Sequence, residues 1–145
     1  MTDTLQQLLD DFSYLDEWED RYKHLIDLGR ALPPMSEALK TPVTKVSGCA
    51  SQVWIHATPV KTADGIKLNF VGDSDALIVK GLIAVAFMIF SPHTVSEIAA
   101  VDAAAIFDKL GLKEHLSPQR SNGLASMVAR IKADAARIAA DPSQA

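Results

Sequence analysis

The chain has 145 residues, of which 48% are hydrophobic and 22% are charged, a composition typical of a globular domain rather than a disordered chain. Fourteen basic residues against eighteen acidic ones give a net charge of −4, which argues against general nucleic-acid binding. The single cysteine excludes an internal disulfide framework and any metal centre built mainly from the chain's own thiolates. The length suits one domain over residues 1–145.

The first forty residues predict two helices and carry most of the negative charge. Apolar residues recur at helical spacing over residues 5–12 and again over 15–29. The proline pair at 33–34 ends the second helix, because proline lacks the amide hydrogen that a helix needs. Nine acidic and four basic residues give residues 1–40 a net charge of −5. We interpret this charge as a solvated helix face, with a docking surface for a basic partner as the alternative.

The middle of the chain predicts a β-hairpin. From Gln52 the apolar residues recur with a period of two, as expected for a strand with one buried face. The same alternation returns after Ala63-Asp64-Gly65, and Asp-Gly is a strong hairpin signal. We therefore expect antiparallel strands near 51–60 and 66–71.

The segment Ala76–Phe90 predicts a core helix. It is apolar over most of its 15 residues and contains Lys80, whereas a membrane-spanning helix needs about 20 apolar residues. Asp73 and Asp75 precede it, and we expect them to cap its first turn rather than to form an acid–base pair. We expect Lys80 to extend its ammonium group into water.

The predicted cellular location follows from the amino terminus and from the unpaired thiol. Met1 to Thr4 lack the basic and apolar segments of a secretory signal. An unpaired cysteine fits a reducing compartment. We therefore expect a cytoplasmic protein without a membrane partner.

The carboxyl-terminal part predicts further helices. Short helices are expected near 94–100 and 102–110, with Gly111 as a carboxyl-terminal cap. Ser117-Pro118 opens the last helix, because serine caps well and proline is tolerated in the first turn. Helices, a small sheet and further helices in this order predict an α+β fold, with the antiparallel sheet packed on one side by helices.

Cys49 is the first candidate for chemistry. Free cysteine is commonly a small buried hydrophobe. However, Gly48 precedes it in a bent connection that would let another molecule approach the sulfur closely. A Cys–His hydrolase or transferase is an open alternative, for which the histidine partner would be one of His24, His56, His93 and His115. No spacing typical of a metal site is present in the sequence.

Arg120 is the second candidate. It falls in the first turn of the last predicted helix, where the helix dipole disfavours a cation. We expect either a carboxylate that holds the guanidinium or a role toward a partner, with an exposed arginine of no special role as the plain alternative. Gly123, one turn further on, is a poor helix former that permits close approach of another segment.

Four segments carry a resemblance to a known family. They are GCASQVW at 48–54, YKHLIDLGRAL at 22–32, GDSDALIVKGLIA at 72–84 and HLSPQRSNGL at 115–124. In sequence, order and spacing they resemble the SufE family of sulfur-acceptor proteins. The resemblance covers nearly the whole chain, from about residue 5 to 138, as one SufE-like domain.

The resemblance implies the SufE/IscU-like fold, an α+β domain shared with the U-type iron–sulfur scaffolds. It implies a sulfur carrier rather than an enzyme, which takes sulfane sulfur as a persulfide on Cys49 from a cysteine desulfurase of the SufS/CsdA type and stimulates that desulfurase. The sulfur would pass to an iron–sulfur scaffold. The chain itself needs no cofactor, since pyridoxal phosphate belongs to the desulfurase. The resemblance also implies a desulfurase contact at Gly48, Ser51, Gln52, Asp75 and Arg120.

The chemistry implied by the resemblance sets two conflicting demands on Cys49. Its thiolate must be accessible when it attacks the partner's persulfide, and the acquired sulfur must afterwards be sheltered. A loop hinged at Gly48 meets both demands if Val46, Val53 and the helix at 76–90 shelter the thiol. A non-covalent activator of the desulfurase is a further alternative, and the oligomeric state stays open, a homodimer included.

Overall fold

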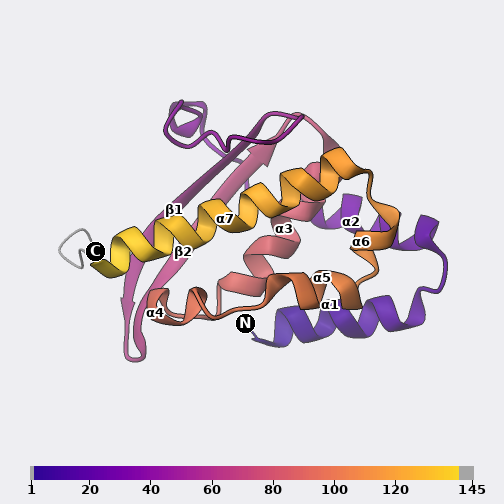
Figure 1. Ribbon diagram of the computed structural model, residues 1–145, viewed down its shortest axis with the longest axis horizontal. Coiled ribbons are helices and arrows are strands. Elements are labelled where there is room, and N and C mark those ends of the chain that lie inside the picture. Colours follow the sequence, from indigo (N-terminus) through magenta and orange to yellow (C-terminus); the bar gives the residue numbers. More distant parts are fainter. Residues whose placement is uncertain (1, 141–145) are drawn as a thin grey trace.

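The computed structural model describes residues 2–140 and confirms the α+β class (Figure 1). Met1 and residues 141–145 of the predicted domain lie outside the described residues. In chain order the elements are α1 (Thr2–Tyr14), α2 (Trp18–Arg30), the 3₁₀ helix η1 (Glu37–Leu39), β1 (Val53–Thr62), β2 (Gly65–Ser74), α3 (Leu77–Phe90), α4 (Val95–Ile98), α5 (Ala103–Lys109), α6 (Leu112–His115) and α7 (Pro118–Ala140).

The two strands form an antiparallel hairpin with Val53 opposite Ser74 and Thr62 opposite Gly65. Strand β1 has the predicted length but lies two residues later, and β2 is longer than predicted, since it continues through Ser74. One face turns to the core, where the Phe70 ring stacks on Phe87 of α3 at 4.9 Å between centroids. The predicted alternation is therefore confirmed, and the helices pack on this face of the sheet.

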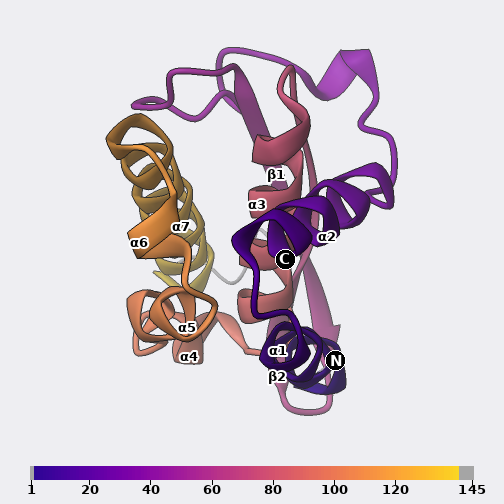
Figure 2. The ribbon, with the colours of Figure 1, turned by 90° about the vertical axis from the view of Figure 1, so that its right-hand side faces the viewer.

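Helix α3 forms the centre of the core. Eleven of its side chains or glycines are buried, and it lies between α2 and α7 (Figure 2). Helix α2 approaches closely because Gly29 and Gly81 meet at the contact: a Cβ atom placed on Gly29 would lie 2.7 Å from the backbone nitrogen of Gly81. Within residues 2–140 no helix combines the length and the apolarity that crossing a bilayer requires.

Arg21 ties the first two helices to the end of α5. Its guanidinium donates to the carbonyl groups of Leu15 at 2.7 Å, Phe12 at 2.9 Å and Leu110 at 3.1 Å. Gly111 follows Leu110 with φ +74°, a left-handed conformation that favours glycine. The predicted cap at Gly111 is thus confirmed, and the turn it makes leads directly into α6.

Most acidic side chains of the first forty residues are exposed, which confirms the solvated helix face over residues 5–40. One exception is Asp11, whose carboxylate lies 3.6 Å from Nε2 of His24. His24 also packs edge-on against Phe12. A docking role for the acidic face stays a prediction.

Candidate functional site around Cys49

Cys49 lies in a six-residue connection just before β1, which we call the Cys49 loop (residues 47–52). The amide of Val46 donates to the carbonyl of Val53 at 2.8 Å and closes the base of this loop. Gly48 has φ +88°, and a Cβ atom placed on it would lie 2.5 Å from Oγ of Ser126. A residue with a side chain would be both strained and crowded here, so the glycine lets the loop turn against α7.

The thiol is half-buried and faces a small hollow. The hollow has a volume of about 120 Å³ and lies between the Cys49 loop, α3 and the start of α7. Its lining residues are Cys49, Ala50, Ser51, Val79, Leu82, Ser117, Gln119, Arg120, Gly123 and Met127. The expected shelter from the helix at 76–90 is therefore present through Val79 and Leu82. Gly123, which was predicted to permit close approach of another segment, lines the hollow from α7.

Burial controls the protonation of the thiol. Desolvation raises the pKa of Cys49 above its ordinary value, because a thiolate is poorly stabilised away from water. Sγ donates to the carbonyl oxygen of Gly123 over 3.5 Å, a weak hydrogen bond that is compatible with the protonated form. In this conformation the thiol is held as a neutral, weakly nucleophilic group.

Asp75 anchors the end of the Cys49 loop and does not cap α3. Its Oδ1 accepts from the amide of Gln52 at 3.0 Å, and its own amide donates to the carbonyl of Gln52 at 3.4 Å. Helix α3 begins after Ala76 without a side-chain cap. The predicted cap is therefore wrong, because the extension of β2 to Ser74 carries Asp75 to the edge beside β1.

Asp73 lies on the outer face of the hairpin in an ion-pair cluster. Its carboxylate is 2.8 Å from Nζ of Lys40 and 3.4 Å from Nζ of Lys80, and it accepts from the amide of Ser74 at 2.8 Å. Burial by itself would raise the pKa of Asp73, but the hydrogen bonds from Lys40 and Ser74 and the charge of Lys80 lower it overall. The expectation that Lys80 extends freely into water is wrong, since its ammonium pairs with Asp73.

Arg120 reaches the rim of the hollow from the first turn of α7. Across residues 2–140 no carboxylate lies within ion-pair distance of its guanidinium, and the side chain is exposed. Its backbone amide donates to Oγ of Ser117 at 3.2 Å, which confirms the predicted serine cap. The alternative of a carboxylate that holds Arg120 is therefore excluded for the described residues.

The structure gathers most of the predicted site residues. Gly48 and Ser51 lie with Cys49 in the loop, Gln52 and Asp75 tie its end, and Arg120 faces it. The four histidines are elsewhere: none lines the hollow, and His115 stacks on Trp18 at 4.6 Å between centroids. A Cys–His pair therefore has no support in the geometry. In the described part of the chain, no three His, Cys, Asp or Glu side chains gather as metal ligands would.

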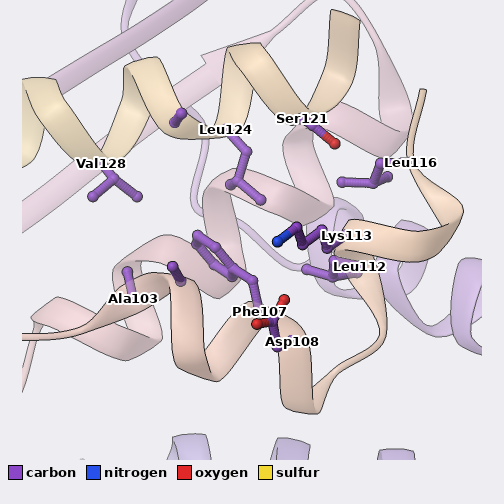
Figure 3. Close-up of a pocket in the computed structure, with 11 residues that line it drawn as sticks. Ala103, Phe107, Asp108, Leu112, Lys113, Leu116, Ser121, Leu124 and Val128 are labelled. Atoms are coloured by element: carbon purple, nitrogen blue, oxygen red, sulfur yellow. The ribbon is translucent and has the colours of Figure 1, made fainter. Parts of the chain in front are cut away.

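A larger hollow opens on the other side of the first turns of α7, between α5, α6 and α7 (Figure 3). It has a volume of about 350 Å³, and its walls are mainly apolar, with Phe107, Leu112, Leu124 and Val128 among them. It contains neither Cys49 nor any other residue that the sequence marked for chemistry. We therefore assign the candidate site to the smaller hollow.

Sequence reasoning missed Arg130 and Asp134, which contact the segment that leads into the Cys49 loop. Their spacing of four residues on a helix signals an ion pair. Nothing in the sequence indicated that the paired arginine also reaches two backbone carbonyls more than eighty residues away.

Comparison with known proteins decides the family. The family model described as "SufE: Fe-S metabolism associated domain" matches residues 6–135. The chain belongs to the SufE family. An uncharacterized SufE-like protein of Rhizobium meliloti (strain 1021) is 53% identical over 132 residues, which cover 91% of this chain and 94% of the relative. A second one, from Rhizobium etli, is 52% identical and covers 91% of this chain and 89% of the relative.

The fold is also found in a solved structure. The solution structure of a hypothetical protein from Thermus thermophilus superposes with a TM-score of 0.74, covering 94% of this chain and 96% of the other. The sequence identity is 21%, so this likeness concerns the fold. The family assignment itself places this SufE-family chain in iron–sulfur metabolism.

Proposed function

We propose that this SufE-family protein accepts sulfane sulfur on Cys49 from a cysteine desulfurase, stimulates that desulfurase and passes the sulfur on for iron–sulfur cluster assembly. The observation that carries the proposal is the position of the only thiol of the chain: a glycine-hinged loop holds it at the mouth of a small hollow. The reducing cytoplasm is the compartment in which such an unpaired thiol persists.

The proposed step is a thiol–persulfide exchange. The Cys49 thiolate attacks the outer sulfur of the desulfurase persulfide and forms a new S–S bond, while the bond between the two desulfurase sulfur atoms breaks. The electron pair of the broken bond leaves with the desulfurase cysteine as a thiolate. The outer sulfur keeps its hydrogen, so Cys49 ends as a persulfide and no external oxidant or reductant is consumed.

The position of Cys49 beside the hollow explains why its thiol would react slowly with other molecules before the protein meets the desulfurase. The raised pKa of Cys49 keeps the thiol protonated while it lies between the loop and α7. Attack requires the loop to turn outward, where the thiol regains solvent and meets positive charge in the partner's active site. Return of the loop would then shelter the extra sulfur beside Val79, Leu82 and Met127.

The desulfurase contact is proposed around this loop. Gly48, Ser51 and Gln52 lie in it, Asp75 ties its end, and Arg120 faces it without an acidic partner among residues 2–140. An exposed guanidinium beside a reactive loop suits a carboxylate on the docking protein. A downstream iron–sulfur scaffold would dock on the same loop after the desulfurase has left.

Mass spectrometry tests the proposal directly. The protein is incubated with a SufS-type desulfurase, its pyridoxal phosphate and cysteine, and the mass of the intact chain is measured before and after reduction. We expect the mass of one added sulfur atom on Cys49, which a reductant removes. Arg120→Ala should lower the yield by weakening the desulfurase contact.

The matched control is Cys49→Ser, which has no thiol. We expect it to gain no sulfur and to lose the stimulation of cysteine turnover. Stimulation that survives in Cys49→Ser would identify a non-covalent activator instead and would reject the sulfur-carrier proposal.

A further inference from the structure

One face of α7 runs alongside the segment that leads into the Cys49 loop. Gly123, Ser126 and Arg130 are spaced by three and four residues, which places them in one row on the helix. They meet the passing segment in order: the carbonyl of Gly123 accepts from Cys49, Ser126 lies against Gly48, and Arg130 reaches the backbone of Val43 and Lys45.

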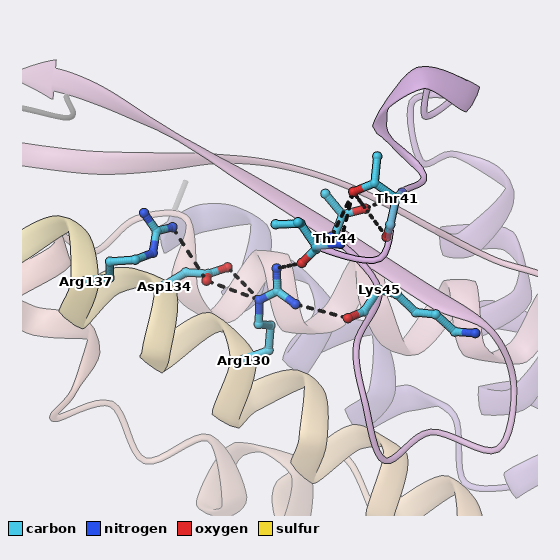
Figure 4. Close-up of polar contacts among 7 residues, drawn as sticks. Thr41, Thr44, Lys45, Arg130, Asp134 and Arg137 are labelled. Atoms are coloured by element: carbon cyan, nitrogen blue, oxygen red, sulfur yellow. Dashed lines mark hydrogen bonds and ion pairs between the residues drawn. The ribbon is translucent and has the colours of Figure 1, made fainter.

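Arg130 makes the strongest contacts in this row (Figure 4). One terminal nitrogen donates to the carbonyl of Val43, and the other donates to the carbonyl of Lys45 at 3.2 Å. Its Nε donates to Asp134 at 3.1 and 3.2 Å, which fixes the guanidinium plane. Asp134 is 8% exposed, so an acidic side chain is buried to orient the arginine.

The other contacts of the segment tie it to the sheet and to the core, where Val46 is buried. Val46 pairs with Val53, and the amide of Ile55 donates to the carbonyl of Thr44 at 2.9 Å, so the base of the loop belongs to the edge of β1. Asp75 ties Gln52 to the end of β2. On the helix side, a 3.5 Å hydrogen bond from the thiol and the packing of Gly48 on Ser126 accompany the contacts of Arg130.

We propose that Arg130 is a positioning residue for Cys49: by clamping the base of the Cys49 loop to α7, it keeps the hollow closed and the thiol sheltered. The role in sulfur transfer rests on the proposed function, whereas the clamp itself is a property of the free protein. Charge-assisted hydrogen bonds to two carbonyls are stronger than neutral ones, so their loss should shift the loop toward the open, reactive arrangement.

The test is the rate at which iodoacetamide alkylates Cys49 in the free, folded protein. We expect Arg130→Gln, whose shorter side chain cannot reach both carbonyls, to raise the rate about tenfold, the factor that corresponds to losing one charge-assisted hydrogen bond. Arg130→Lys keeps the positive charge but lacks the two terminal nitrogens that bond both carbonyls, so it should give an intermediate alkylation rate. Hydrogen exchange of residues 43–52 should accelerate in the same order.

The matched control is Lys132→Gln. Lys132 lies on the same helix and donates to the carbonyls of Ala99 at 3.3 Å and Val101 at 2.8 Å, which belong to a different connection. It should lose comparable stability in urea without accelerating the alkylation of Cys49. If Arg130→Gln is too unstable to purify, Asp134→Asn, which frees the guanidinium plane, should still raise the rate.

A wild-type alkylation rate in the Arg130 or Asp134 variants would overturn the clamp, and so would an equal rise in Lys132→Gln. Neither measurement involves a desulfurase. A clamp that holds while no sulfur appears on Cys49 would therefore reject only the proposed function, and sulfur uptake with an unaltered alkylation rate would reject only the clamp.

Discussion

At the scale of single residues, the candidate site holds its thiol in surroundings that favour the protonated form. The Cys49 thiol lies against the carbonyl of Gly123 and beside apolar side chains, and this burial raises its pKa. The structure offers no neighbouring imidazole in the hollow to draw off the proton. For the proposed sulfur transfer, activation would therefore come from movement of the loop or from a partner rather than from a resident base.

This protonation state predicts the pH profile of alkylation. In the folded protein, the rate at which iodoacetamide modifies Cys49 should rise with pH, with a midpoint above that of the same thiol in the urea-unfolded chain. A folded midpoint equal to or below the unfolded one would show that burial does not protect the thiol.

The raised pKa of Cys49 also makes the stability of the folded protein depend on pH. The protonated thiol is favoured in the folded state, so its contribution to stability is complete below the pKa of the unfolded chain and is lost as the pH rises through the folded pKa. The variant Cys49→Ser lacks this loss and serves as the reference for urea unfolding at each pH.

At the scale of elements, two glycines on different helices give opposite predictions. A Cβ atom on Gly81 of α3 would lie 2.1 Å from the carbonyl oxygen of Leu25, so Gly81→Ala must push α2 and α3 apart. We expect a loss of about 2 kcal/mol or more in the free energy of unfolding. On Gly123 of α7 the nearest atom would be Sγ of Cys49 at 3.6 Å, an ordinary contact.

Gly123→Ala should therefore raise stability by up to about 0.8 kcal/mol, the difference in helix propensity. Its methyl group would narrow the hollow next to the thiol and reduce the yield of the persulfide. Urea unfolding of both variants checks the pair, and similar midpoints for the two alanines would contradict the packing argument.

The sequence was a good guide to the elements with strong periodicity. The two amino-terminal helices, the hairpin and the apolar helix at 76–90 all follow from apolar spacing and turn residues, because one buried face dominates each of them. The short helices η1 and α6 were not predicted, since three or four residues carry no period.

The sequence identified the thiol of the candidate site but not most of the contacts that hold the loop around it. Cys49, its glycine and Arg120 stood out locally or through the family motif. The roles of Asp75, Lys80 and Arg130 depend instead on partners far along the chain: Gln52, Asp73 and the carbonyls of Val43 and Lys45. Local capping rules favoured a different partner for Asp75, and the register of the hairpin overrode them.

At the scale of the whole molecule, two arginines join segments that are far apart in the sequence through hydrogen bonds to backbone carbonyls. Arg130 links α7 to the edge of the hairpin. Arg21 links the α1–α2 corner to the end of α5 through three carbonyl groups. These carbonyls lie at or just beyond the end of a helix, where acceptors tend to be left unpaired, although that of Phe12 also accepts from the amide of Leu15 at 3.2 Å.

Arg21→Met should therefore destabilise the folded protein. It removes three charge-assisted hydrogen bonds and takes the donor away from the carbonyls of Leu15 and Leu110, so we expect the free energy of unfolding to fall by about 3 kcal/mol. Lys23→Met removes the same charge from an exposed position of the same helix, so it should cost less than about 0.5 kcal/mol. Comparable losses in the two variants, measured by urea unfolding, would assign the effect to net charge rather than to the three hydrogen bonds.

The size of the hollow beside Cys49 also bears on oxidative damage. A volume of about 120 Å³ corresponds to about four water molecules at liquid density. Hydrogen peroxide fits such a space, whereas a tripeptide disulfide such as oxidised glutathione does not. With the loop closed, the thiol is half-buried and protonated, so its main protection against either oxidant is its slow reactivity.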